Sequence, residues 1–419
     1  MTTTILRAEH VLDGLGNAPR SDTVVALEGE RISYVGHRAA LSNGTDTPEL
    51  TELSFPGCTI MPGLIDPHVH LIFSASMDPW GDMGRENDAQ LMLRAAKNAA
   101  ALLRAGVTTV RDCGARNNTI FDFRGAVEMG LAPSPRLLVA GRPVTRTGGH
   151  LRQFGGCADG PDEIRKAIRG LFDQGADFIK VPATAGFGSR HLDAYTSAYT
   201  DEELSAAVDE CHKLGRKITV HVTGTVGALQ AVRCGVDSIE HLPMMPSPNR
   251  WEFNDELARE VRDRGIYVSA TIAAGYRAQQ YIDAGNWAVP RPGRLGLAER
   301  IENMKKLYEA GVQLVTGTDS GARMTAFEES VALEMETMVG IGMPTLEAIS
   351  AGTSRAAVAV EMDDKVGSVE VGKYADLLIV RGNPAEDISA VRNVVAVFKG
   401  GEQVHGSQIA RPVAVGVGA

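Results

Sequence analysis

Apolar and polar positions alternate in a regular order through the middle of the chain. Eight short apolar runs are expected to be buried β-strands, at residues 63–71, 107–114, 136–141, 177–183, 217–224, 236–242, 266–272 and 312–320. Helical stretches lie between them, and several are followed by a glycine that suits a helix end, such as Gly106, Gly215 and Gly311. Strands that alternate with helices predict an α/β fold with a parallel sheet, and eight such units predict a (β/α)8 TIM barrel.

The two ends of the chain have a different pattern. Short strand-like runs separated by Gly and Asn fill the first 60 residues, and a similar pattern of short runs occurs again only near the C-terminus. Two such end segments can share one sheet if the middle folds as a compact insert whose ends lie close together. We therefore expect a TIM-barrel domain over residues 61–362 and a small β-sandwich domain built from both termini, residues 1–60 and 363–419.

Charge and composition exclude several classes of protein. The chain has 52 acidic and 42 basic residues, a net charge of −10, and no basic stripe, so nucleic acid is not an expected partner. No apolar run approaches the ~18 residues that span a bilayer, and the first residues lack a signal-peptide pattern. The five cysteines form no CxxC pair, which favours a reducing compartment. We expect a cytoplasmic protein that makes no membrane contact.

Side chains that commonly bind metals follow four of the predicted strands. His68 and His70 are two residues apart near the end of the first strand, so both point to the same face. His221, His241 and Asp319 lie near the ends of the fifth, sixth and eighth strands. Alone, two histidines in this spacing could also be structural residues that form hydrogen bonds with their neighbours at the mouth of a barrel. Because the C-terminal ends of barrel strands meet at one rim, the five side chains together predict a metal site.

Lys180 has the corresponding position on the fourth strand. An ammonium group there would repel divalent cations, but a desolvated lysine loses its proton readily, and the neutral amine can add carbon dioxide to form a carbamate. A carboxylated Lys180 would be negatively charged and able to bridge two metals. The alternative is a structural lysine in a salt bridge.

The motifs around these residues resemble a known family. GLIDPHVH, FIKV, TVHV, SIEH and TGTDS resemble the metal-dependent amidohydrolase superfamily, and GSVEVGKYADLLIV resembles the terminal β-domain of its members. The metal ligands that the resemblance implies are His68, His70, Lys180, His221, His241 and Asp319. The first two histidines and Asp319 would hold one metal, the other two histidines the second, and N6-carboxylysine at Lys180 would bridge them. Two zinc ions suit these ligands, and manganese, cobalt or iron would also fit.

The RTGGH segment at 146–150 narrows the resemblance to a branch of the superfamily. Together with IEHL and TGTDS it resembles prolidase-like carboxypeptidases and ochratoxin-hydrolysing amidohydrolases. The implied substrate is an amide between an acyl group and a C-terminal amino acid: an N-acyl amino acid, an Xaa-Pro-like dipeptide, or ochratoxin A, which yields ochratoxin alpha and phenylalanine. Thr223 is expected to contact the substrate. Some dipeptidase relatives carry Tyr at this position, so carbonyl polarisation is expected to rest on the metal and on His150.

Several other residues are expected near the substrate. His150 follows two glycines that let its loop approach a ligand, although an ordinary loop histidine is an open alternative. Arg146 and Arg190 are candidates for pairing with a substrate carboxylate. Aromatic residues are frequent in the predicted rim loops, for example Phe73, Trp80, Phe187 and Trp287. They favour an apolar pocket, although loops packing on one another would show the same pattern.

The reaction that follows from these expectations is hydrolysis of an amide by a metal-bridging hydroxide. Asp319 would accept the proton of the attacking water and pass it to the leaving amine, which makes it a catalytic proton shuttle. Two alternatives stay open: a lactonase or phosphotriesterase that uses the same binuclear site, and a non-catalytic scaffold. The expected partners are a small amide or dipeptide substrate and further copies of the chain in a homo-oligomer.

Overall fold

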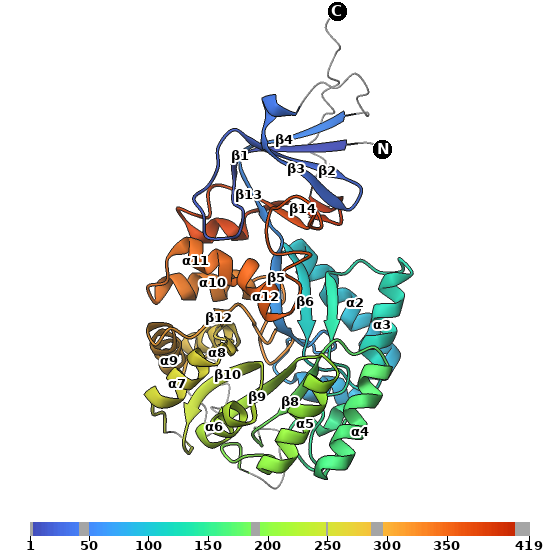
Figure 1. Cartoon of the computed structure of the whole chain (residues 1–419), viewed down its shortest axis with the longest axis vertical. Coiled ribbons are helices and arrows are strands. Elements are labelled where there is room, and N and C mark those ends of the chain that lie inside the picture. The colour runs from blue at the N-terminus through green and yellow to red at the C-terminus, as the bar shows by residue number, and fades with distance from the viewer. Residues whose placement is uncertain (1–2, 42–49, 186–192, 249, 286–295, 407–419) are drawn as a thin grey trace, which may run out of the picture.

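The computed structural model describes residues 3–41, 50–185, 193–248, 250–285 and 296–406. Figure 1 shows two parts joined end to end, with strands from both ends of the chain in one part and the alternating strands and helices in the other. Within the described ranges, no helix is long and apolar enough to cross a membrane.

Parallel strands form the centre of the larger part, and each overlaps a strand predicted from the sequence. They are β5 (Leu64–Val69), β6 (Val107–Asp112), β7 (Arg136–Val139), β8 (Ile179–Pro182), β9 (Ile218–Gly224), β10 (Ser238–Met245), β11 (Tyr267–Ser269) and β12 (Leu314–Val315). They pair in chain order within a three-stranded sheet, β5-β6-β7, and a five-stranded sheet, β8-β9-β10-β11-β12. The mixed α/β class and the strand order are as predicted.

The two parallel sheets are connected by backbone contacts at both of their outer edges. On one side, Val144 N, just after β7, donates a hydrogen bond to Lys180 O in β8 (2.9 Å). On the other side, Val69 in β5 forms an isolated parallel bridge with Ser320, which follows β12. The ends of the first and last parallel strands are therefore neighbours, although more than half of the chain lies between them.

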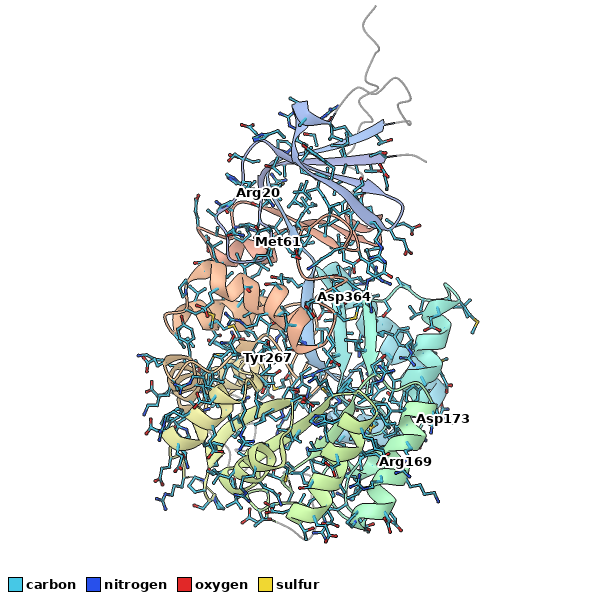
Figure 2. All side chains as sticks on the ribbon, viewed as in Figure 1. Arg20, Met61, Arg169, Asp173, Tyr267 and Asp364 are labelled. Atoms are coloured by element: carbon cyan, nitrogen blue, oxygen red, sulfur yellow. The ribbon has the colours of Figure 1, made fainter. Side chains whose placement is uncertain are left out.

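Helices lie around the outside of the parallel strands (Figure 1). Their bounds are α1 (Pro79–Arg85), α2 (Asp88–Arg104), α3 (Thr119–Glu128), α4 (Gly160–Asp173), α5 (Asp201–Lys213), α6 (Thr225–Cys234), α7 (Asp255–Asp263), α8 (Ala273–Asp283), α9 (Leu297–Glu309), α10 (Ser330–Gly340), α11 (Thr345–Ala351) and α12 (Ser354–Ala359). Figure 2 shows the charged side chains of Arg169 and Asp173 on α4, away from the strands. The polar faces of such helices are in water, and their apolar faces cover the sheets.

The glycines expected at helix ends are found there. Gly106, Gly215 and Gly311 each lie two residues beyond the last residue of α2, α5 and α9, with φ of 85°, 66° and 83°. Glycine adopts this left-handed conformation without the strain that a side chain would cause. These positions end the helices and return the chain to the next strand.

Strands from both ends of the chain form a single seven-stranded sheet. Its order is β15-β14-β13-β4-β1-β2-β3. The bounds are β1 (Thr3–Val11), β2 (Thr23–Glu28), β3 (Arg31–His37), β4 (Leu50–Pro62), β13 (Leu377–Arg381), β14 (Val394–Lys399) and β15 (Glu402–Gly406). The long strand β4 pairs with β1 on one side and with β13 on the other. The expectation that both ends share a sheet is confirmed, and the strands expected in two layers belong to one hydrogen-bonded sheet.

Apolar side chains from both ends of the chain pack together in this sheet. Leu6 of β1 and Val25 of β2 belong to the same buried cluster as Phe398 of β14. The rings of Phe55 and Phe398 make an edge-on contact with centroids 6.5 Å apart. The N-terminal and C-terminal strands therefore share one core, which holds the two ends of the larger part together.

Candidate metal centre

The predicted metal ligands meet at the C-terminal ends of the parallel strands, as the sequence leads one to expect. They all line one cavity of about 380 Å³. The residues are His68 and His70 at the end of β5, Lys180 in β8, His221 in β9, His241 in β10 and Asp319 after β12. The six side chains come from five separate chain segments that meet at the cavity.

His68, His70 and Asp319 form the tighter part of the cluster. The Nε2 atoms of His68 and His70 each lie 3.7 Å from Asp319 Oδ1. Two donors that share a zinc ion, each at roughly 2.0–2.2 Å from it, are separated by somewhat more than 3 Å, so these three side chains fit one divalent ion. Asp319 N also donates to His68 O (2.8 Å), which fixes the segment after β12 against β5.

The other donors lie beside this group. The ring centroids of His221 and His241 are 4.6 Å apart, and that of His241 is 5.2 Å from His68. Lys180 is 1% exposed, and its Nζ atom has no hydrogen-bond partner among the described residues. A buried ammonium without a partner is unfavourable, whereas a carbamate on this nitrogen would supply oxygen donors toward the histidines. The chemistry of the donor set therefore fits a second divalent ion.

The nitrogens of His68 and His70 that face away from Asp319 have partners of their own. His68 Nδ1 lies 2.8 Å from Glu240 Oε2, and His70 Nδ1 lies 2.9 Å from the carbonyl oxygen of Gly114. Gly114 O accepts a hydrogen bond from His70 Nδ1, and the Glu240 carboxylate faces His68 Nδ1 as an ion-pair partner. Both contacts favour a proton on Nδ1, which leaves the lone pair of Nε2 available to a metal. The surrounding residues thus select the tautomer that metal binding requires.

His241 is oriented in the same manner by Thr271. The two are joined by a 2.7 Å hydrogen bond between His241 Nδ1 and Thr271 Oγ1. The Thr271 hydroxyl donates a hydrogen bond to Ala270 O (2.7 Å), so it must accept the hydrogen bond from His241 Nδ1. The Nε2 atom of His241 is then free to act as a ligand.

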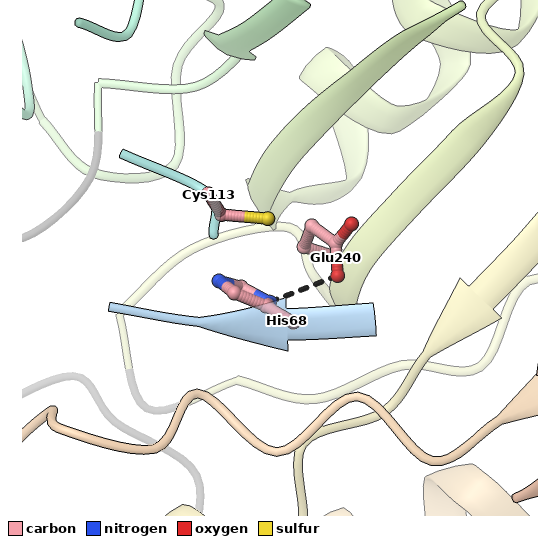
Figure 3. A group of neighbouring side chains, drawn as sticks. All are labelled: His68, Cys113 and Glu240. Carbon is pink, nitrogen blue, oxygen red and sulfur yellow. Dashed lines mark ion pairs between the residues drawn. The ribbon is translucent and has the colours of Figure 1, made fainter. Parts of the chain in front are cut away.

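Glu240 supports His68 from behind, and Figure 3 shows the two with Cys113. Glu240 is fully buried, and its other oxygen lies 2.7 Å from Arg111 NH2. Burial raises the pKa of this carboxyl, but the charges of His68 and Lys180 more than offset that effect and hold it well below its usual range. Burial raises the pKa of the Cys113 thiol to about 12, so it stays protonated. Glu240 is therefore better suited to orient His68 than to hold an ion together with Cys113.

Three histidines of the cavity favour their neutral form. Burial, followed by the charges of neighbouring side chains, lowers the pKa of His70, His221 and His241 well below the usual value. A metal binds the neutral imidazole, so little proton release opposes binding near neutral pH.

Buried carboxyls that the sequence did not single out fix the backbone near His68 and His70. Asp66 accepts from Thr318 Oγ1 (2.6 Å), and Asp112 accepts from Leu71 N (2.8 Å). Burial raises the pKa of both carboxyls to about 7. Each ties β5 to a neighbouring strand segment. Their role could not be inferred from the sequence because it depends on contacts between segments that are distant along the chain.

The residues predicted to contact substrate fall in different places. His150 and Thr223 line the cavity, and the His150 ring lies 4.6 Å from His221. Arg146 is not among the residues that line the described cavity, so its role as a substrate contact stays a prediction. Arg146 O accepts from Gly149 N in a turn, and the Arg146 side chain acts electrostatically on Asp159, which is outside the cavity.

The expected apolar wall is present in part. Phe73 and Trp80 line the cavity, with ring centroids 4.8 Å apart. Phe187, Arg190 and Trp287 are outside the described residues. Polar residues that the sequence did not point to also line the cavity: Gln153, Arg300, Asn303 and Arg323. Their place in helices and loops carries no motif that could have revealed them.

Histidines, a lysine and an aspartate gathered at the C-terminal ends of parallel strands define the class of metal-assisted hydrolases. Comparison with known families agrees, since the Amidohydrolase family matches residues 59–404. The chain belongs to the Amidohydrolase family, whose members are generally metal-dependent.

Two relatives illustrate the similarity. Ochratoxinase of Aspergillus niger is 26% identical over 447 aligned residues, which cover 97% of this chain and 87% of that protein. Its crystal structure superimposes with a TM-score of 0.81 at 25% identity, covering 98% of this chain and 97% of that one. A crystal structure of a Xaa-Pro dipeptidase with bound methionine gives a TM-score of 0.84 at 29% identity, covering 96% of this chain and 100% of that one. The protein is accordingly a hydrolytic enzyme that acts on C–N bonds, not a non-catalytic scaffold.

Proposed function

We propose that the enzyme hydrolyses an amide that joins an acyl group to a C-terminal amino acid. The observation that carries the proposal is the cavity, in which six candidate ligands lie beside the apolar rings of Phe73 and Trp80. A similarity to ochratoxinase and to a Xaa-Pro dipeptidase supports the same class of substrate. Candidate substrates are N-acyl amino acids, Xaa-Pro-like dipeptides and ochratoxin A.

Two divalent ions, zinc in the first instance, complete the proposed site. His68, His70 and Asp319 would hold one ion, and His221 and His241 would hold the other, with carboxylated Lys180 between them. Such ions lower the pKa of water and polarise a carbonyl group. The neutral histidines and the isolated Nζ atom of Lys180 are the observations that support this assignment.

Asp319 would move the proton during the proposed reaction. Its side chain is 21% exposed and lines the cavity, so water and substrate can reach the carboxylate. In the proposed reaction the carboxylate accepts a proton from the attacking water and donates it to the nitrogen of the leaving amine. The backbone bond to His68 and a φ of 62° fix the position of Asp319.

Other residues of the cavity would bind and orient the substrate. His150 lies beside His221, and its carbonyl oxygen accepts from Thr145 Oγ1 (2.6 Å), which fixes the loop. His150 would contact the substrate carbonyl. Phe73 and Trp80 would exclude water around an apolar side chain.

The finer points of the architecture belong to the same proposal. The two parallel sheets would close into a (β/α)8 barrel over residues 61–362, and the terminal sheet would fold over as a small β-sandwich from residues 1–60 and 363–419. A homo-oligomer and a cytoplasmic location stay predictions.

A side-by-side assay tests the proposed function. The zinc-loaded enzyme would be offered N-acetyl amino acids, Xaa-Pro dipeptides, ochratoxin A, aryl lactones and organophosphate triesters. Hydrolysis of one or more amides with higher kcat/KM than any lactone or triester is expected. Turnover of lactones or triesters alone would contradict the proposal and favour the lactonase or phosphotriesterase alternative.

A further inference from the structure

Arg300 on α9 presents a positive charge to the cavity that the proposed reaction does not yet use. It is partly buried and lines the cavity together with the candidate metal ligands. Its NH2 group donates to Thr271 O (2.5 Å) and to Thr271 Oγ1 (3.3 Å). Among the described residues, no carboxylate forms an ion pair with it.

The carboxyl that acts most strongly on Arg300 is poorly suited to neutralise it. Glu334 on α10 accepts from Ala273 N (2.7 Å), and burial raises its pKa to about 8. A carboxyl with that pKa is largely protonated at neutral pH. The Asp319 carboxylate also acts electrostatically on Arg300, but it is assigned to the metal centre. Since a buried cation without a paired counter-ion is unfavourable, an anionic ligand in the cavity would be stabilised by pairing with the guanidinium.

Thr271 links this guanidinium to the metal centre. The same hydroxyl that accepts from Arg300 also accepts from Nδ1 of His241. Thr271 has φ of 54°, which is strained for a β-branched residue and persists only where the surroundings enforce it. One residue therefore fixes both a candidate ligand and the guanidinium, so their separation is constrained.

We propose that Arg300 binds the carboxylate of the amino-acid half of the substrate, with Thr271 as the residue that positions it relative to His241. The inference rests on the proposed function and adds the residue that selects a free acid. The planar guanidinium suits a carboxylate, with two parallel N–H···O bonds as the favoured arrangement. The sequence predicted this role for Arg146 and Arg190, and the lining of the cavity adds Arg300 as a candidate.

The specificity that follows is a preference for acids over their neutral analogues. A site that pairs a polar group of its substrate rejects an analogue without that group, because its own buried group is then left unpaired. Wild-type enzyme should cleave N-acetyl-L-phenylalanine, N-acetyl-L-methionine or N-acetyl-L-proline with kcat/KM at least about 100-fold higher than the matching primary amide.

Substitution of Arg300 tests the assignment directly. Arg300→Met should lower kcat/KM for the acid by about 100-fold or more, chiefly through KM, and change kcat/KM for the primary amide little, at unchanged metal content. Arg300→Lys keeps the charge but not the planar guanidinium, so its kcat/KM for the acid should lie between the values of wild type and Arg300→Met. Arg259→Met on the exposed side of α7 is the matched control and should behave as wild type.

The outcomes separate this inference from the proposed function. Equal losses on acid and amide in Arg300→Met, or equal turnover of both by wild type, would overturn the role of Arg300. Absence of any amide hydrolysis by wild type would refute the proposed function instead. If Arg300→Met does not fold, product inhibition of wild type decides: L-phenylalanine should inhibit at least tenfold more strongly than L-phenylalaninamide, and equal inhibition would overturn the inference.

Discussion

The metal centre and the substrate wall occupy one cavity, yet they are built in different ways. Each candidate ligand lies in a parallel strand or in the segment that directly follows one, where the pairing of the strands fixes its direction. The wall consists of residues from loops and from helices α1 and α9, such as His150, Trp80 and Arg300. Their positions depend on contacts such as the one between Arg300 and Thr271. In the proposed function, residues of the strands and the segments after them supply the chemistry, whereas loops and helices select the substrate.

The largest effect is expected at Asp319, the residue of the metal centre with a proposed role in proton transfer. Asp319→Asn keeps the shape and one oxygen donor but removes the basic carboxylate. Because general acid-base catalysis contributes about 10²–10⁴-fold, kcat should fall by about that factor while much of the metal is retained. Steady-state kinetics with metal analysis measures both quantities. The matched control is Asp209→Asn on α5, whose side chain is 73% exposed. Wild-type turnover in Asp319→Asn would end its role as a proton shuttle.

Lys180 tests whether a carbamate belongs to the metal centre. Lys180→Ala should lose roughly 100-fold or more in kcat/KM, since loss of even an outer-shell partner of a metal typically costs 10–100-fold. Acetate or propionate should restore part of the activity by taking the bridging position. The exposed Lys213→Ala on α5 serves as the control and should need no rescue. Full activity of Lys180→Ala without added carboxylate would show that the bridge is not required.

Glu240 distinguishes a residue that orients a ligand from the ligand itself. Glu240→Gln removes the charge that faces His68 and Arg111 but keeps the shape. Zinc affinity, measured by chelator competition on folded protein, should fall by about 10–100-fold. Loss of a buried charge partner also destabilises the fold by roughly 3–5 kcal/mol, which thermal unfolding would record separately. Unchanged zinc affinity in folded Glu240→Gln would mean that His68 needs no such support.

The difference between the metal centre and the substrate wall also explains which residues of the site could be predicted from the sequence. His68, His70 and Asp319 were predictable because strand periodicity and chain order are local signals. The sharing of one sheet by β4, β1 and β13 was predictable because the same texture appears at both ends of the chain.

Other residues of the site lie in no local sequence pattern that would reveal their role. Arg300 lines the cavity and Arg146 does not, and no sequence motif distinguishes the two arginines. Glu240 lies in a motif next to a ligand, but its role depends on Arg111, which is 129 residues away. The strained φ of Thr271 is a property of the folded chain alone.

The smallest effect concerns the pH dependence of stability beside the wall. Burial raises the pKa of Glu334 from its usual value of 4.5 to about 8, so the folded chain holds a proton there that the unfolded chain releases. As pH rises through this window, the contribution of this group to folding stability falls. Glu334→Gln does not titrate, so its stability relative to wild type should increase between about pH 4.5 and 8, by a few kcal/mol at most.

Denaturant unfolding at several pH values measures this difference. Glu309→Gln on the exposed end of α9 is the control and should track wild type across the same range. A stability difference between Glu334→Gln and wild type that does not change with pH would show that Glu334 is ionised in the folded protein. Arg300 would then have a charged neighbour, which would weaken the contrast between wall and centre.

The most direct test of the account is an anomalous-diffraction experiment on crystals of the zinc-loaded enzyme, grown with bicarbonate present. We predict two zinc peaks in the cavity, one contacted by His68, His70 and Asp319 and the other by His221 and His241. Electron density for a carboxylated Lys180 should lie between the peaks. No zinc peak at these residues, or an unmodified Lys180 directed away from them, would contradict the account.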